Sequence, residues 1–256
     1  MILLANLNTL FIGQSLHHLV ETDSTNSYAI DILTKSAPAD GTVVVADYQR
    51  AGRGQFDRTW QSKAGENLLF SLILYPHFVA PSRQFVLTQA ISVGLAEALQ
   101  HLCSVPISVK WPNDLYIGRK KVAGMLIQTA LGQQKMQYAV VGIGLNVNQI
   151  EFPSTVPNPT SLSITTQRTF DRAEVLSTIL EYLERWYLNL RSGQTRLIEQ
   201  RYQQLLFQFG EWALYRVPGG EPFSGKIVGF TPQGKLEMET QSGIQVFNFK
   251  EIQFLI

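Results

Sequence analysis

The chain has 256 residues, of which 45% are hydrophobic and 16% charged, and its formal net charge is +1. This composition suits a globular protein with a sizeable core, and the small charge excludes a general attraction to nucleic acid or anionic membranes. The single cysteine, Cys103, excludes an internal disulfide, and no segment approaches the ~20 apolar residues of a membrane span. We therefore expect a soluble, cytoplasmic protein that binds neither DNA nor membranes.

The first half of the sequence predicts a helix followed by strands and a second helix. Residues 24–35 have the pattern of a helix that Ser24 or Thr25 caps. The apolar segments that follow predict two buried strands and one buried helix, at residues 42–47, 67–75 and 85–102, respectively.

The middle of the chain predicts a second group of strands and a long helix. Glycine and proline punctuate the pattern, and the hairpin turns near Gly118 and Arg119. A strongly amphipathic helix follows, for which Asp171 and Glu174 form a capping box. The expected order is strand, hairpin, strand, loop and helix, at residues 107–111, 114–131, 138–148, 151–159 and 171–190.

The pattern changes near Gly210, where short β-like segments begin to alternate with glycine turns. About 45 residues of such segments are typical of a small barrel attached to a larger domain. We expect two domains, at 1–208 and 209–256, in an α+β protein.

Four short segments carry chemistry. In Gly52–Gly54, two glycines expose backbone N–H groups to an anion, and Arg53 adds a bidentate cation. The others are "KWPND" at 110–114, "KKVAG" at 120–124 and "GIGLN" at 142–146, which combine lysines, a carboxylate and strand glycines. Taken one at a time, each is also explained as an exposed turn, a solvated hairpin end or a bulge.

Other motifs fail at a specific position. Residues 220–226 match the start of a P-loop, but Ile227 replaces the Ser/Thr that binds Mg²⁺. Two G-x-G segments have Asp57 and Val147 where a dinucleotide fingerprint needs glycine. No cysteine or histidine spacing resembles a zinc site, and there is no nucleophile elbow. We therefore predict no resident metal and no covalent nucleophile.

In this order the segments resemble the biotin protein ligase family. The matching residues are "STN" at 24–26, "QRAGRGQFDRTW" at 49–60, "KWPND" at 110–114, "KVAG" at 121–124 and "GIGLN" at 142–146. The resemblance extends from about Leu19 to the end of the chain. It implies a class II synthetase-like mixed β-sheet flanked by helices, with a small SH3-like β-barrel at the C-terminus.

The resemblance also implies a reaction. Biotin and MgATP give biotinyl-5′-adenylate and pyrophosphate, and the biotinyl group then passes to a lysine of the biotin carboxyl carrier protein of acetyl-CoA carboxylase. ATP, Mg²⁺ and biotin are thus the expected ligands, and a homodimer through an exposed sheet edge is possible.

Site residues follow from the same resemblance. Those expected at biotin are Ser24, Thr25, Asn26, Gln49, Gly52, Arg53, Lys121, Gly124, Gly142 and Gly144. Those expected at the adenylate or ATP are Arg53, Gly54, Gln55, Trp60, Lys110, Asn113, Lys121 and Asn146. The expected catalytic residues are Arg53, Lys121, Asn113 and Asp114.

The chemistry of these residue types agrees with that reaction. A carboxylate that attacks an α-phosphate brings two anions together, and Arg53 and Lys121 can offset the charge. Asp114 can accept a proton from the acceptor lysine. Segments 43–46 and 125–127 can supply an apolar wall for the biotin rings.

The sequence departs from the family pattern in the glycine–arginine loop and at the N-terminus. Gln55 stands where many members have arginine, and Asp57 where many have glycine or asparagine. We expect the loop to retain the adenylate less tightly. Fewer than 25 residues precede Ser24, too few for a helix-turn-helix domain, so we expect a monofunctional ligase.

Three alternatives stay open at this point. A lipoate–protein ligase or octanoyltransferase would have the same fold, but "GRGQFDRTW" followed by "KWPND" favours biotin. A non-catalytic biotin or nucleotide sensor would not need Asp114. An RNA-binding protein is disfavoured by the near-neutral charge.

Overall fold

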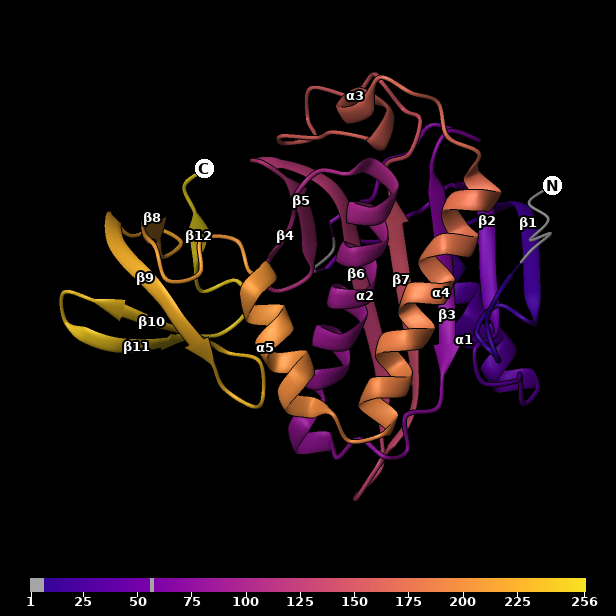
Figure 1. Ribbon diagram of the computed structural model, residues 1–256, viewed down its shortest axis with the longest axis horizontal. Coiled ribbons are helices and arrows are strands. Elements are labelled where there is room, and N and C mark those ends of the chain that lie inside the picture. The colour runs from indigo at the N-terminus through magenta and orange to yellow at the C-terminus, as the bar shows by residue number, and fades with distance from the viewer. Residues whose placement is uncertain (1–6, 56–57) are drawn as a thin grey trace.

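The computed structural model describes residues 7–55 and 58–256. Its centre is a seven-stranded sheet in the order β1-β2-β3-β7-β6-β5-β4 (Figure 1). The pair β1/β2 is parallel and the other neighbours are antiparallel, which makes the sheet mixed. The strands are β1 (Leu16–Thr22), β2 (Val43–Gln49), β3 (Leu68–Leu74), β4 (Ile107–Lys110), β5 (Asp114–Ile117), β6 (Lys120–Leu131) and β7 (Met136–Leu145).

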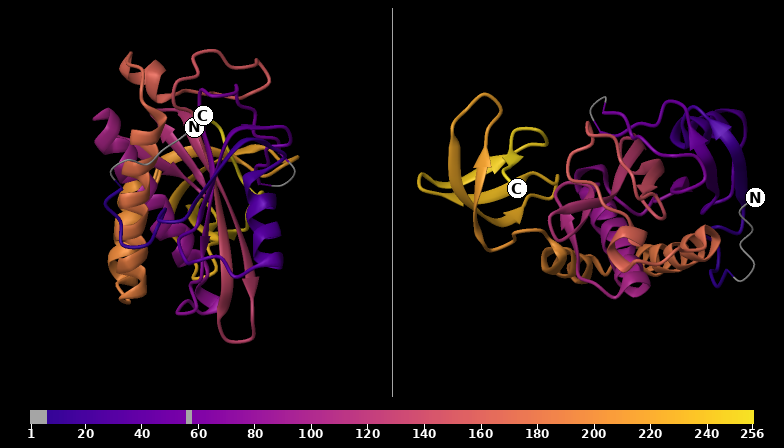
Figure 2. Two further views of the ribbon diagram at one scale, coloured as in Figure 1. Left: turned by 90° about the vertical axis from the view of Figure 1, so that its right-hand side faces the viewer. Right: turned by 90° about the horizontal axis from the view of Figure 1, so that it is seen from above.

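Helices cover both faces of this sheet unequally. Figure 2 shows α4 and α1 on opposite faces, with α2 on the side of α4. The central strand β3 reads LLFSLIL and is buried throughout, because both of its faces are covered. The helices are α1 (Thr25–Lys35), α2 (Phe85–Cys103), α3 (Leu162–Thr166), α4 (Arg172–Arg191) and α5 (Thr195–Leu205), with a 3₁₀ turn at Pro81–Arg83.

The helix caps follow the sequence. The Ser24 side chain accepts a hydrogen bond from the N–H of Ser27 at the start of α1. Asp171 caps α4 by accepting from the N–H groups of Ala173 and Glu174. Both caps were predicted, and each fixes where a helix starts relative to the sheet.

A second, five-stranded antiparallel sheet lies beside the β4 edge of the main sheet (Figure 1). The chain enters it through residues that hydrogen-bond to β4, since the Phe207 N–H donates to the Val109 carbonyl. Its strands, in the order β11-β10-β9-β8-β12, are β8 (Trp212–Arg216), β9 (Pro222–Phe230), β10 (Leu236–Thr240), β11 (Gly243–Phe247) and β12 (Gln253–Phe254).

The α+β class, the mixed sheet with flanking helices and a separate C-terminal β-structure are confirmed. The buried residues of the second sheet, such as Tyr215 and Met238, belong to the same hydrophobic cluster as the core under the main sheet. A division into domains at 208/209 remains a proposal, which limited proteolysis near that position would test.

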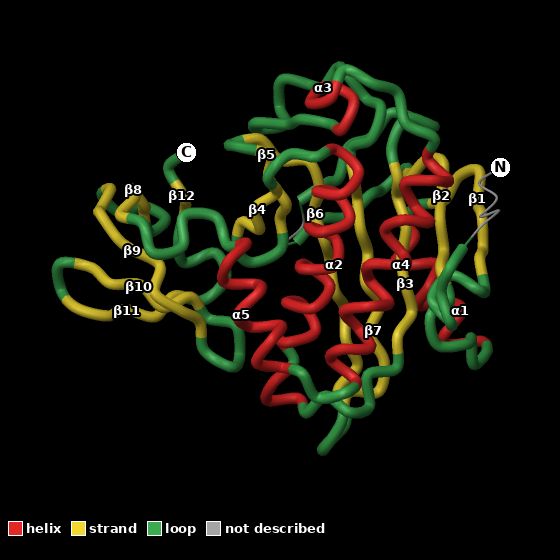
Figure 3. Tube along the Cα trace, in the orientation of Figure 1, coloured by secondary structure: helices red, strands yellow, loops and turns green. Residues whose placement is uncertain are grey.

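Several elements were not predicted: β1, α3, α5 and β12. The strand β6 pairs with both β5 and β7. The expected hairpin (β5 and β6) and the strand after it (β7) therefore form one continuous meander. Figure 3 shows that the segment between β7 and α4, which includes α3, covers one end of the main sheet. No helix within the described residues is long and apolar enough to cross a membrane.

Candidate active site

The predicted segments meet on the face of the sheet that carries α1. Three glycines leave the neighbouring strands β6 and β7 bare there, and Gly124 pairs directly with Gly144. A Cβ on Gly142 would overlap the side-chain amide of Asn26, and one on Gly144 would overlap the indole of Trp60. A Cβ on Gly124 would lie 3.1 Å from Trp60. The glycines are therefore required for close approach of other groups to the sheet.

A cluster of polar side chains, which we call the polar pocket, lies at the first turn of α1. The N–H and Oγ1 of Thr25 contact Gln49 Oε1 at 2.7 and 3.0 Å. Ser71 Oγ lies 2.8 Å from Thr25 Oγ1 and 2.6 Å from Asn26 Oδ1. These groups come from α1, β2 and β3, so the pocket exists only in the assembled sheet.

The Asn26 amide completes this pocket. Its Nδ2 donates to the Leu126 carbonyl at 3.2 Å and to Gln128 Oε1 at 2.9 Å. Ser71 and Gln128 were not predicted as site residues. Ser71 had a signal in the sequence, because it is the one polar residue in an apolar strand and a buried hydroxyl needs a partner.

Lys121 and Asp114 form an ion pair beside the glycines. Lys121 Nζ lies 2.7 Å from Asp114 Oδ1, and both side chains are half-buried. The same ammonium stands 5.4 Å from the centre of the Trp60 ring. The pair results from the adjacent strands β5 and β6, which place both residues near Gly124.

The side-chain amides of Asn113 and Asn146 donate hydrogen bonds to backbone carbonyls. Asn113 Nδ2 donates to the Met125 carbonyl, and the Met125 N–H returns a bond to the Asn113 carbonyl at 3.0 Å. Asn146 Nδ2 donates to the Thr160 carbonyl at 2.8 Å. Both asparagines therefore fasten the segments that carry Asp114 and the loop before α3.

Lys110 faces the site from the end of β4. Its ammonium stands between two aromatic rings, 5.4 Å from the centre of Tyr116 and 4.8 Å from that of Phe254. Burial is the main cause that lowers the pKa of Lys110 below its usual range. Phe254 belongs to the second sheet and was not predicted.

The glycine–arginine loop folds back as a hairpin over the glycines of the sheet. The Trp60 N–H donates to the Gly52 carbonyl at 2.9 Å, and the Gly54 N–H to the Arg58 carbonyl at 2.6 Å. The Arg53 side chain is exposed. The tip at 56–57, including Asp57, lies outside the described residues, while Gln55 lies within them.

Trp60 has one unsatisfied polar atom. Its Nε1 is buried and has no hydrogen-bond partner in the part of the chain that the structure describes. Buried N–H groups are rarely left without an acceptor, so this indole is a candidate for contact with a ligand.

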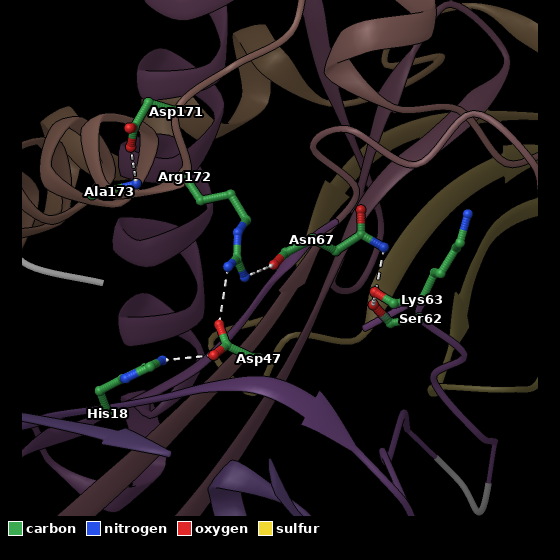
Figure 4. A network of polar contacts seen from close by, with 8 residues as sticks. All are labelled: His18, Asp47, Ser62, Lys63, Asn67, Asp171, Arg172 and Ala173. Atoms are coloured by element: carbon green, nitrogen blue, oxygen red, sulfur yellow. Dashed lines mark hydrogen bonds and ion pairs between the residues drawn. The ribbon is translucent and has the colours of Figure 1, made fainter. Parts of the chain in front are cut away.

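The stem of the loop is anchored by a network that the sequence did not reveal (Figure 4). Asp47 accepts from His18 Nε2 and from Arg172 Nη2, both at 3.0 Å. Arg172 also donates to the Asn67 carbonyl at 3.3 Å, and Asn67 Nδ2 donates to Ser62 Oγ at 2.9 Å. The network ties β1, β2 and α4 to the residues just after Trp60.

Known proteins are similar to this chain in sequence and in fold. Residues 20–146 match the model of the biotin/lipoate A/B protein ligase family. A bifunctional ligase/repressor BirA of Bacillus spizizenii is 32% identical over 96% of this chain and 76% of its own length. A biotin–[acetyl-CoA-carboxylase] ligase of Paracoccus denitrificans is 30% identical over 92% of this chain and 99% of its own. The solved biotin protein ligase of Aquifex aeolicus in complex with biotin and ATP has a TM-score of 0.77 and 30% identity, over 94% of this chain and 98% of that one.

Proposed function

The chain belongs to the biotin protein ligase family, and we propose how its residues perform that family's reaction. The protein is an ATP-dependent biotin–[acetyl-CoA-carboxylase] ligase: it makes biotinyl-5′-adenylate and then biotinylates a lysine of a carrier protein. The observation that carries the assignment of residues is a bare strip of three glycines between a polar pocket and a group of cations.

Biotin would lie along the glycine strip. Its fused rings would lie beside Gly142 and Gly144, next to the Asn26 amide and the Trp60 indole that pack over these glycines. The ureido group has one carbonyl and two N–H groups, which suit the amides and hydroxyls around Thr25 and Asn26. Its carboxylate would then point toward Lys121 at the other end of the strip.

Adenylate formation joins two anions, and the cations lower the cost. The biotin carboxylate oxygen attacks the α-phosphorus of ATP, the bond to the β-phosphate oxygen breaks, and pyrophosphate leaves. Lys121, Lys110 and Arg53 would balance the charge that accumulates on the phosphate oxygens. The loop that carries Trp60 would exclude water from the mixed anhydride.

Magnesium fits this site as a companion of the nucleotide. Within residues 7–55 and 58–256, no group of three or more His, Cys, Asp or Glu side chains could hold a metal ion. Mg²⁺ usually binds through substrate phosphates with one or two carboxylates, and Asp114 is the carboxylate beside the cations. When bound, the ion would neutralise phosphate charge.

Transfer needs a neutral amine. The acceptor lysine loses a proton, its nitrogen attacks the biotinyl carbonyl carbon, and AMP leaves with the bridging oxygen. Asp114 is the group placed to accept that proton or to orient the amine.

The acceptor test also decides between biotin and lipoate. A purified biotin carboxyl carrier domain is incubated with the protein, MgATP and either biotin or lipoate, and its mass is measured. We expect a biotin-sized gain in the first tube alone. A lipoate-sized gain in mass would favour a lipoate ligase. If the carrier domain gains no mass in either tube and no pyrophosphate is released, a sensor is favoured.

We make three further proposals, which concern the oligomeric state, DNA binding and the cellular location. We propose a homodimer through the edge strand β1, whose Val20 is 76% exposed; light scattering tests it. We propose that the protein acts as a ligase without operator binding, which a gel-shift assay tests. We also propose a cytoplasmic location, in keeping with the free Cys103; cell fractionation tests it.

A further inference from the structure

Lys110 is a largely buried cation without a counter-ion of its own. Within the described residues, its ammonium has no hydrogen bond and no carboxylate within ion-pair distance, while Asp114 is already paired with Lys121 at 2.7 Å. Burial is the largest cause that lowers the pKa of Lys110. The positive charges of Lys121 and Arg58 lower it further, whereas the negative charge of Asp114 raises it. An unpaired cation in such a place is costly unless a ligand supplies the negative charge.

Aromatic rings take the place of the missing carboxylate. The ammonium lies 4.8 Å from the centre of Phe254 and 5.4 Å from that of Tyr116, within the range of cation–π attraction. A ring stabilises a cation without neutralising it. A carboxylate at the same place would compete with an incoming anion, and a ring does not.

The second sheet delivers Phe254 to this position. Strand β12 pairs with β8, and Phe254 packs edge-on against Tyr215 with ring centres 5.1 Å apart. Loops between strands of the same sheet contact the neighbouring Trp111, whose Nε1 donates to the Gly234 carbonyl at 2.9 Å and whose ring centre lies 5.1 Å from that of Phe249. The second sheet therefore contacts "KWPND" at two successive residues.

We propose that Phe254, together with Tyr116, is a positioning residue that holds the Lys110 ammonium unpaired so that it binds a phosphate group of ATP. The inference rests on the proposed function, because it takes the nucleotide as the anion. It makes strand β12 of the second sheet a part of the nucleotide site, through Lys110.

The first test compares three variants. Phe254→Leu keeps an apolar side chain and removes the ring, Phe254→Tyr keeps a ring, and Phe223→Leu removes another ring that packs on Tyr215. Because one cation–π contact contributes about 0.5–2 kcal/mol, we expect Phe254→Leu to weaken binding of a non-hydrolysable ATP analogue and of inorganic pyrophosphate by about 3- to 30-fold. We expect Phe254→Tyr and Phe223→Leu to bind both probes like the wild type, as measured by calorimetry with biotin present.

The second test separates a role through Lys110 from a packing role. In a double-mutant cycle, Phe254→Leu should have little further effect on nucleotide binding in a Lys110→Met background. In turnover, Phe254→Leu should raise the KM for ATP by a larger factor than it lowers kcat. Transfer from synthetic biotinyl-5′-adenylate to the carrier domain should proceed at the wild-type rate.

Three results would overturn the inference: equal losses in Phe254→Leu and Phe223→Leu, additive effects in the cycle, or a defect confined to transfer, which would point to an acidic group of the acceptor. Failure of the proposed function is a separate result. It would appear as a wild-type protein that binds the nucleotide and makes no biotinyl-adenylate, and the comparison of Phe254 variants in binding would still stand.

Discussion

The pocket at the first turn of α1 and the cationic group at β4–β6 satisfy their polar atoms in different ways. In the pocket, Thr25, Asn26 and Ser71 are already hydrogen-bonded to one another or to neighbouring amides. In the cationic group, the described residues leave the Lys110 ammonium and the Trp60 Nε1 without hydrogen-bond partners. One region is complete without ligand, and the other needs an anion.

This difference matches the two substrates. A neutral ureido group is best recognised by dipoles that are fixed beforehand, since reorganising them would reduce affinity. A triphosphate brings its own charge, so a cation without a counter-ion, such as Lys110, is stabilised most when the triphosphate binds. The comparison implies that substitutions in the pocket should affect biotin, whereas those among the cations should affect ATP and the chemical step.

The largest effect should come from Lys121, which serves the cationic region. We expect Lys121→Ala to lower the rate of adenylate formation by about 10²–10³-fold, because a preorganised charge at the developing oxyanion is lost. Lys120→Ala is the matched control, since Lys120 is the exposed neighbour on the same strand. Pyrophosphate release measures both. Equal rates for the two variants would contradict the role of Lys121.

A methyl group added to the glycine strip should disrupt the polar pocket and weaken biotin binding. In Gly142→Ala, the new Cβ would overlap the Asn26 amide and displace it from Gln128. Overpacking of this kind costs about 1–3 kcal/mol, so we expect the KM for biotin to rise about 10- to 100-fold while the KM for ATP changes little. Gly132→Ala, in the β6–β7 turn, should leave both constants unchanged.

Ser71 tests whether the pocket is held together by its own hydrogen bonds. Ser71→Ala removes the donor shared by Thr25 Oγ1 and Asn26 Oδ1. Leaving buried acceptors unpaired should lower the free energy of unfolding by about 1–3 kcal/mol. Denaturant titration measures it, and bound biotin should restore part of the loss. An unchanged midpoint would show that the pocket does not depend on this hydroxyl.

Gln55 should have a smaller effect. Gln55→Arg adds a charge to the glycine–arginine loop, and we expect biotinyl-adenylate to dissociate about five-fold more slowly, equivalent to ~1 kcal/mol. Gln61→Arg adds the same charge beyond Trp60 and serves as the control. An adenylate off-rate that is unchanged by Gln55→Arg, or slowed equally by both, would refute the specific role of this position.

The pH dependence of stability should give the smallest effect. Burial lowers the pKa of Lys110, so the folded chain binds this proton more weakly than the unfolded chain does. Its destabilisation is complete below the folded pKa and disappears as the pH rises toward the ordinary value near ~10.4. The unfolding free energy of the ligand-free protein should therefore rise with pH in that window, relative to Lys110→Met. The opposite slope would mean that Lys110 has a counter-ion.

The sequence predicted the elements that have a clear apolar pattern. The strand β3 and the helix α2 are largely buried, and their sequences are predominantly apolar. The strand β1 reads LHHLVET and has no continuous apolar pattern. The helix α5 is mostly polar, and β12 has only two residues. These elements form because tertiary pairing overrides weak local preference.

The site was predictable where a motif carries it. Lys121 and Asp114, both expected among the catalytic residues, form an ion pair. Asn113 and Asn146 remain predictions for the substrate site, and their amides also donate hydrogen bonds to backbone carbonyls. Gln128, Asp47 and Phe254 reach the site or its supports through strand register and packing between distant segments, which spacing along one sequence does not encode.

The most direct measurement of the account is adenylate formation in the absence of any acceptor. The purified protein is mixed with biotin and MgATP, quenched, and assayed for biotinyl-5′-adenylate and pyrophosphate. We expect about one equivalent of biotinyl-5′-adenylate and of pyrophosphate per chain. The polar pocket and the cationic region, which binds the phosphate groups of ATP, should suffice for adenylate formation. Nucleotide binding without adenylate, or a biotinyl group attached covalently to the protein itself as an intermediate, would contradict it.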